Sequence, residues 1–142
     1  MTETSGFDPA GFMKLVRRYG HGGALGIRYR DHGPDWAELE LPYAPALVGV
    51  EASGVLASGP IISLMDMAMS LAVWLRQGRF RAQATMDLRV DYLRPAAPGR
   101  DLVGRSECYR VTRSIGFTRG LAHDGDPDDP VAHVAATFMF MD

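Results

Sequence analysis

The sequence has little cysteine and lacks an uninterrupted apolar run long enough to cross a membrane. Cys108 is the only cysteine, so no intramolecular disulfide can form and a reducing compartment is expected. The N-terminus is polar and acidic, which argues against a secretory signal. The longest apolar stretch, residues 61–75, is broken by Ser63, Asp66 and Ser70 and is shorter than a membrane span. We therefore expect a cytoplasmic protein with no membrane partner.

Excess charge is also missing. The formal net charge is -2, and among the 15 basic residues only Lys14 is a lysine. A chain so close to neutrality has no electrostatic reason to bind nucleic acid. The apolar fraction of 46% and the charged fraction of 23% are typical of a soluble globular protein. Length and composition predict one domain over residues 1–142, with a sizeable apolar core.

The N-terminal third predicts a helix followed by a hairpin. Asp8 and Pro9 favour an N-capped helix that ends at Gly20, and the next residues, His21-Gly22-Gly23, are interpreted as part of this stop and turn. Apolar residues then alternate with period two over residues 24–43, interrupted by a turn-forming segment at residues 32–35. This pattern is typical of a β-hairpin.

The rest of the chain predicts one apolar helix and four long strands. An irregular loop over residues 44–57 leads into a helix from about Pro60 to Arg76. Alternating segments that follow predict strands at residues 82–94, 101–111, 114–123 and 131–141. Strands around one embedded helix define an α+β domain in which the helix packs on a sheet.

The apolar helix carries one carboxylate, Asp66. Apolar side chains surround the helix on nearly all sides, so protein must enclose it. Asp66 shares a narrow stripe with Ser63 and Ser70, three and four residues away. A carboxylate there must be hydrogen-bonded, paired or working in a cleft. Two interpretations are open: a structural acceptor satisfied by the two serines, or a catalytic group.

A second candidate feature is the start of the same helix. Ser58-Gly59-Pro60 is typical of a helix N-terminus. The amides of Ser58, Gly59 and Ile61 lack intrahelical partners and lie at the positive end of the helix dipole, where they could polarise a carbonyl oxygen. Pro60 contributes no donor.

These segments resemble a known family. The central segment reads Gly54-x-x-Ala57-Ser58-Gly59-x-x-x-x-Leu64-x-Asp66-x-Ala68-Met69. It resembles the motif of PaaI-type hotdog-fold acyl-CoA thioesterases, in which Asn-x-x-Gly-x-x-His-Gly-Gly leads into Leu-x-Asp-x-Ala. A later segment, residues 85–99, is similar to that family's strand and turn, and the resemblance covers nearly the whole chain. It implies a hotdog fold, an antiparallel sheet of about six strands wrapped around a long central helix.

The resemblance also implies an activity and roles for individual residues. The family hydrolyses an acyl-CoA thioester to free acid and CoA, without a metal and without a cofactor beyond the CoA of its substrate. By motif position, Asp66 would be the general base or nucleophile, and Ser58 or Gly59 would give the oxyanion amide. Thr85 would help to hold the nucleophilic water.

Assembly and substrate contacts follow from the same resemblance. The family forms homodimers, often dimers of dimers (homotetramers), with acyl-CoA bound at the subunit interface. Arg94 and Arg113 are candidates for binding CoA phosphates. Ser114 lies in a segment near which the family's pantetheine passes.

Three motif positions depart from the family. Glu51 stands where the family has Asn, Ala57 where it has His, and Ser58 where it has the first Gly. Ionised Glu51 can only accept hydrogen bonds, so it would either oppose an oxyanion or act as a second acid or base. The departures keep open an alternative, a hotdog protein that binds acyl-CoA without hydrolysing it. A hotdog hydratase or dehydratase would need a His near the helix start, where Leu56 and Ala57 stand.

Overall fold

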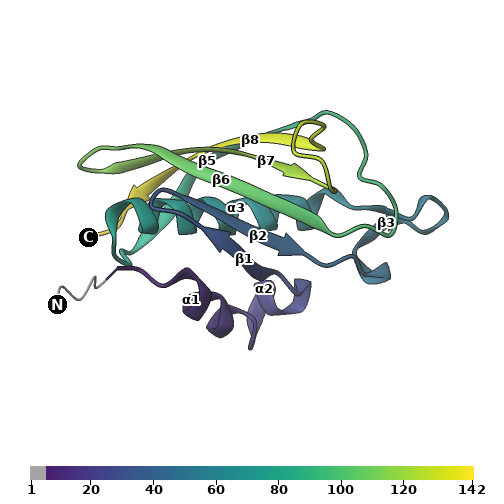
Figure 1. Cartoon of the computed structure of the whole chain (residues 1–142), viewed down its shortest axis with the longest axis horizontal. Helices are drawn as coiled ribbons and strands as arrows, with labels where there is room; N and C mark the ends of the chain where they lie inside the picture. The colour runs from purple at the N-terminus through teal and green to yellow at the C-terminus, as the bar shows by residue number, and fades with distance from the viewer. Residues whose placement is uncertain (1–5) are drawn as a thin grey trace.

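A six-stranded antiparallel sheet curves around one long helix, α3 (Ser58–Gln77), in the computed structural model of the chain (Figure 1). The sheet order is β1-β2-β6-β7-β8-β5, so β1 and β5 are the edge strands. The structure describes residues 6–142, and residues 1–5 of the polar N-terminal segment lie outside the described part. The strands are β1 (Arg28–His32), β2 (Trp36–Leu41), β5 (Gln83–Tyr92), β6 (Leu102–Val111), β7 (Ile115–His123) and β8 (Ala132–Phe140). The expected α+β architecture is confirmed.

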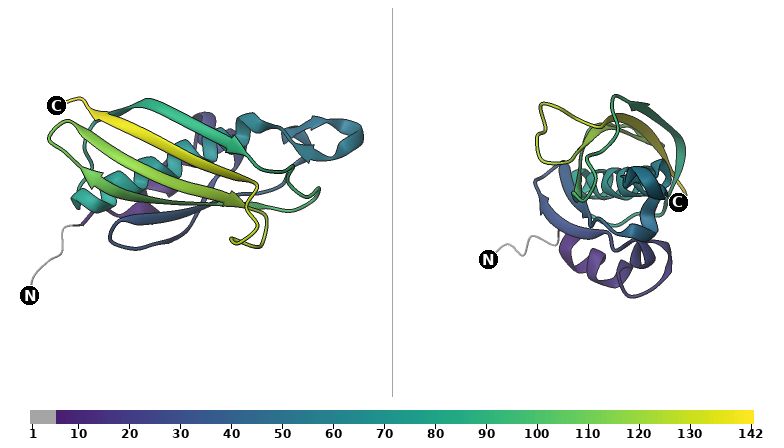
Figure 2. Two further views of the ribbon diagram at one scale, coloured as in Figure 1. Left: turned by 90° about the horizontal axis from the view of Figure 1, so that it is seen from above. Right: turned by 90° about the vertical axis from the view of Figure 1, so that its right-hand side faces the viewer.

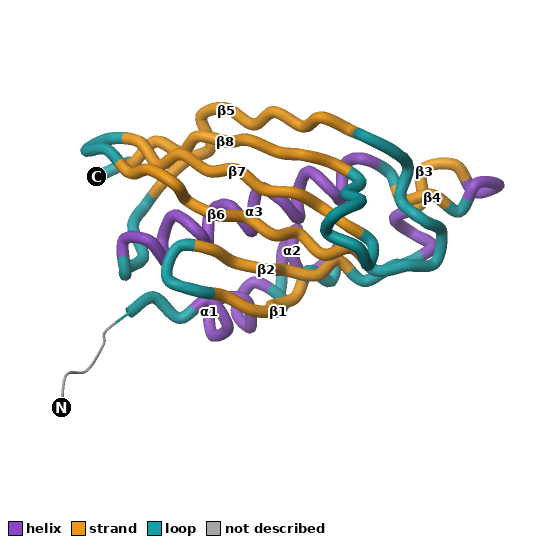
Figure 3. Tube along the Cα trace, turned by 45° about the horizontal axis from the view of Figure 1, so that its top comes forward, coloured by secondary structure: helices purple, strands orange, loops and turns teal. Residues whose placement is uncertain are grey.

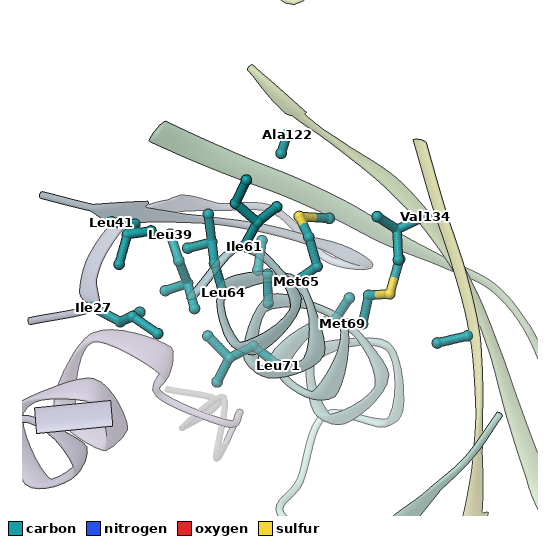
Figure 4. Close-up of a cluster of buried hydrophobic side chains, with 14 of the residues drawn as sticks. Ile27, Leu39, Leu41, Ile61, Leu64, Met65, Met69, Leu71, Ala122 and Val134 are labelled. Atoms are coloured by element: carbon teal, nitrogen blue, oxygen red, sulfur yellow. The ribbon is translucent and has the colours of Figure 1, made fainter. Parts of the chain in front are cut away.

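The core lies between α3 and the concave face of the sheet (Figure 2). The helix packs against β2, β6 and β7, and its side chains Leu64, Met65 and Met69 are fully buried there (Figure 4). A Cβ atom on Gly104 of β6 would lie 2.9 Å from the Leu64 side chain, so the helix packs here against bare backbone. Among the described helices, α3 is long and apolar enough to span a membrane, but it is the core helix of this sheet.

The start of α3 differs from the expected one by two residues. The N-cap is Ala57, which makes no side-chain cap hydrogen bond, and the helix begins at Ser58. Pro60 is therefore the third helical residue. Its missing N–H breaks no helical hydrogen bond because the first turn of a helix has no intrahelical acceptors for its amides.

The N-terminal prediction is wrong at one boundary. The first helix, α1 (Pro9–Val16), ends before Gly20, and residues that the pattern assigned to a turn and a strand form a second helix, α2 (Gly20–Leu25). Gly20, the first residue of this helix, and Gly26, which caps its end, have φ angles of 75° and 74°, a region that favours glycine. The period-two spacing of Leu25 with later residues is therefore coincidental, and β1 starts only at Arg28.

The irregular loop has a small structure of its own. It contains two short strands that pair with each other, β3 (Val48–Val50) and β4 (Val55–Leu56). Two 3-10 turns complete it, η1 (Pro45–Leu47) and η2 (Glu51–Ser53). This β3–β4 hairpin projects beyond the sheet at the end where α3 begins (Figure 3).

Candidate active site

Asp66 lies near the middle of α3 and is half-buried. Its Oδ1 accepts a hydrogen bond from the Thr85 hydroxyl on β5, with an oxygen–oxygen distance of 2.7 Å. The two neighbouring serines are engaged elsewhere. Ser70 donates to the backbone carbonyl of Asp66 at 2.9 Å, and Ser63 pairs with His21. Among residues 6–142, the side-chain partner of the Asp66 carboxylate is therefore Thr85 and neither of the two serines.

A β-bulge aims Thr85 at the helix. The register between β5 and β8 shifts between Thr85 and Asp87, which leaves Met86 as an extra residue. Strict alternation would put Thr85 and Leu88 on opposite faces of β5. The bulge lets Thr85 bond to α3 while Leu88 and Val90 still pack against the core.

The carboxylate opens into a cavity of about 280 Å³ between the N-terminal helices and α3. One part of the lining is polar and the other is apolar, as in sites that bind an apolar group with a reactive polar end. Polar side chains come from His21, Ser63 and Asp66, and the apolar part comes from Val16, Ile27 and Met67, with Gly22 completing the wall.

His21 is the site residue that the sequence pattern does not identify. The sequence pattern predicts a turn at the His-Gly-Gly triplet, yet the structure places His21 Nε2 2.7 Å from Ser63 Oγ. Period and spacing cannot reveal this contact because 42 residues separate the two positions. The only available signal was a histidine within a glycine-rich segment, which favours close approach of the backbone to another element.

The helix start and Asp66 are well separated within one chain. Ser58 and Gly59 are exposed in the first turn of α3, and the Ser58 carbonyl accepts a 3.4 Å hydrogen bond from Tyr92. Eight residues of helix from Ser58 to Asp66 correspond to about 12 Å along the axis. These amides and the Asp66 carboxylate of the same chain therefore cannot both contact one carbonyl group.

Glu51 lies in η2, at the tip of the β3–β4 hairpin, and is exposed. It lines a different cavity, of about 420 Å³, together with Tyr43, Val48 and Gly54. Within one chain the structure does not bring Glu51 to the Asp66 cavity. Ala57 contributes its amide to the Leu47 carbonyl at 2.8 Å, so its backbone ties the helix start to η1.

The two arginine candidates are in contrasting environments. Arg94 binds Asp124 with both terminal nitrogens, at 2.7 and 3.0 Å, and also reaches Asp129 at 3.2 Å. This guanidinium holds the pKa of the buried Asp124 carboxyl far below its ordinary value. Arg113 is exposed in the β6–β7 turn, and among residues 6–142 it has no ion-pair partner.

Arg94 and Ser114 lie at opposite ends of β8. The Arg94 amide bonds to the carbonyl of Val131, directly before that strand, and the Ser114 carbonyl accepts from Phe140 at its end. Arg113 precedes Ser114 in the same turn. The predicted CoA contacts are therefore not gathered into one surface within a single chain.

An antiparallel sheet wrapped around a long central helix is the architecture of hotdog proteins. The thioesterase superfamily model matches residues 53–131. The medium/long-chain acyl-CoA thioesterase YigI of Escherichia coli is 30% identical in an alignment of 130 residues, and the match covers 82% of this chain and 82% of YigI. The chain therefore belongs to the thioesterase superfamily.

Solved structures of other proteins have the same fold as this chain. A crystal structure of a Pseudomonas aeruginosa protein has 38% identity and a TM-score of 0.80, and the match covers 93% of this chain and 96% of that one. The Escherichia coli PaaI protein of the phenylacetic acid degradation operon has 16% identity, a TM-score of 0.77 and 94% coverage of both chains, which supports the fold alone. The predicted hotdog fold and PaaI-type resemblance are confirmed.

Proposed function

We propose that this protein hydrolyses acyl-CoA thioesters with Asp66 as general base. Asp66 removes a proton from water, and the water oxygen forms a bond to the thioester carbonyl carbon. The carbon–sulfur bond then breaks, giving a carboxylic acid and the CoA thiolate, which takes up a proton. A thiol with a pKa near 8.5 leaves readily, so one positioned carboxylate and an amide donor suffice without a metal or a further cofactor.

One observation carries the proposal: Asp66, whose carboxylate is hydrogen-bonded to Thr85, lines a cavity that also has apolar side chains, in a thioesterase-superfamily fold. Direct nucleophilic attack by Asp66 is the other route open to a carboxylate. An acyl adduct on Asp66, detected by mass spectrometry in rapidly quenched protein, would assign that route instead.

The separation of the two halves of the site supports a homo-oligomer. The amides of Ser58 and Gly59 and the carboxylate of Asp66 are about 12 Å apart along one helix, so they meet at a thioester only if they come from different copies. The unpaired edge of β5 offers a surface for that contact, because it exposes Met86 and Tyr92 beside the open face of α3. A dimer or a dimer of dimers, with the site at the subunit interface, satisfies this geometry.

The substrate assignment uses the relatives. YigI is named as a medium/long-chain acyl-CoA thioesterase, and we extend acyl-CoA as the substrate class to this chain. Arg113 and Ser114 are the favoured CoA contacts, because Arg113 is exposed whereas two carboxylates occupy Arg94. We also propose a cytoplasmic location, because acyl-CoA is water-soluble and the single cysteine, Cys108, suits a reducing compartment. We expect no binding to nucleic acid or to a membrane.

The test is release of CoA thiol from a panel of acyl-CoAs of increasing chain length. Wild type should turn over, and Asp66→Asn should lower kcat by about 10²–10⁴-fold. Thermal stabilisation by CoA should persist in Asp66→Asn. Asp128→Asn, which changes an exposed carboxylate in the β7–β8 turn, is the matched control and should retain wild-type kcat.

The second candidate function is acyl-CoA binding without hydrolysis. Glu51, which is exposed on its hairpin, does not supply the amide side chain of the motif's Asn. Ala57 at the helix start does not supply the imidazole of the motif's His. Saturable stabilisation of the wild type by acyl-CoA with no thiol release from any of the substrates would assign this function and overturn the hydrolytic one.

A further inference from the structure

Close packing of backbone brings His21 to α3. Gly20 turns the chain from α1 into α2 with a positive φ angle. The next helix then packs so tightly on α1 that a Cβ atom on Gly22 would lie 2.6 Å from Val16 Cγ1. No residue of α2 is fully buried, and Leu25 at its C-terminal end packs against the core. The other end of the helix places the His21 imidazole at the cavity.

His21 and Ser63 are hydrogen-bonded to each other, and Asp66 lines the same cavity. His21 Nε2 lies 2.7 Å from Ser63 Oγ, and Ser63 precedes Asp66 by three residues, so the two side chains share one face of α3. All three residues line the same cavity. Because His21 is exposed, its hydrogen bond adds little to folding stability. A role at the cavity explains the contact better than a role in the fold.

We propose, on the basis of the thioesterase function above, that His21 is a positioning residue of the hydrolytic site and acts through Ser63. A serine hydroxyl has one hydrogen to donate and two lone pairs that accept. When neutral His21 accepts that hydrogen at Nε2, the Ser63 oxygen turns a lone pair toward the cavity. A water molecule there donates one hydrogen to Ser63 and the other to Asp66.

This arrangement fixes the attacking direction of the water. With both hydrogens engaged by side chains one helical turn apart, the water presents its own lone pair to the thioester carbonyl carbon. Thr85 occupies Oδ1 of Asp66, which leaves Oδ2 for the proton that Asp66 removes. In this scheme His21 contacts neither the water nor the substrate. Its role is to orient the Ser63 hydroxyl, which contacts the water.

The test compares His21→Ala, Ser63→Ala, the double variant and His21→Gln by steady-state kinetics with one acyl-CoA. Each alanine variant should lower kcat about tenfold, while KM and Tm stay at wild-type values. The double variant should lose no more than either single one, because the two residues act as a unit. His21→Gln, whose amide oxygen can accept from Ser63, should recover most of kcat. His133→Ala, an exposed histidine on β8, is the control that should match wild type.

Two kinetic results would overturn the proposal. One is an unchanged kcat in His21→Ala, whether or not Tm falls, and the other is losses that multiply to about a hundredfold in the double variant. A second readout does not depend on turnover. The ¹⁵N signal of His21 Nε2, assigned by its loss in His21→Gln, should shift in Ser63→Ala, and an unshifted signal rejects the pair. Wild-type protein that hydrolyses no acyl-CoA rejects the thioesterase function, and the ¹⁵N signal then decides on the pair alone.

Discussion

The Thr85 hydroxyl donates a 2.7 Å hydrogen bond to Asp66 Oδ1 and so links the edge strand β5 to the middle of α3. We expect Thr85→Val, which keeps the shape and removes the donor, to lower kcat about tenfold, since one lost hydrogen bond of about 1.4 kcal/mol corresponds to that factor. Thr85→Ser should stay near wild type. Steady-state thiol release measures both, and equal kcat values for the valine and serine variants would contradict the orienting role.

The secondary structure of the central and C-terminal parts was predictable because burial imposes simple periods there. Apolar residues all around α3, and alternation along β6, β7 and β8, follow from one helix enclosed by one sheet. The candidate base, Asp66, was predictable for the same reason, as a charged residue in an apolar helix. Its partner Thr85 came from the family resemblance.

The parts that the sequence did not predict depend on contacts between distant residues. The six-residue helix α2 has no buried residue and no side-chain cap, so neither period nor capping marks it. The bulge at Met86 exists because Thr85 and Leu88 must both face inward, which alternation alone forbids. Glu51 is distant from Asp66 within the chain, and a single sequence does not specify how two copies meet.

Mixing two inactive variants tests whether the site is shared between copies. Asp66→Asn removes the base, and Gly59→Pro removes one amide donor at a position where an added side chain meets nothing within 4 Å. If the two variants pair at random, half of the dimers are hybrids. Each hybrid has two sites, and one of them combines an intact Asp66 with an intact Gly59. Co-refolded chains should therefore recover about a quarter of wild-type activity. Each variant refolded alone is the control. No recovery from a mixture shown to contain hybrids would place both groups in one chain.

The apolar wall of the Asp66 cavity should set the acyl chain length. Met67→Phe narrows the cavity from α3, so kcat/KM for the longest accepted acyl-CoA should fall about tenfold, while the shortest substrates keep wild-type values. Leu15→Phe adds the same ring on α1 at a residue that is 55% exposed and does not line the cavity, and it should leave the profile intact. A uniform loss for all chain lengths would show that the acyl group lies elsewhere.

The Arg94–Asp124 pair should make stability depend on pH in acid. Asp124 is buried, accepts from Arg94 and from the Ala97 amide at 2.8 Å, and has a folded-state pKa below its ordinary value of 3.8. Because folding lowers this pKa, the stabilisation is complete well above pH 4 and is lost as pH falls toward the folded-state value. Asp124→Asn should lower the free energy of unfolding at pH 7 by about 2 kcal/mol. Urea melts give the free energy of unfolding of wild type and of Asp124→Asn, and the difference between the two should stay constant between about pH 7 and 5 and shrink below about pH 4. A difference that grows in acid would contradict the assignment.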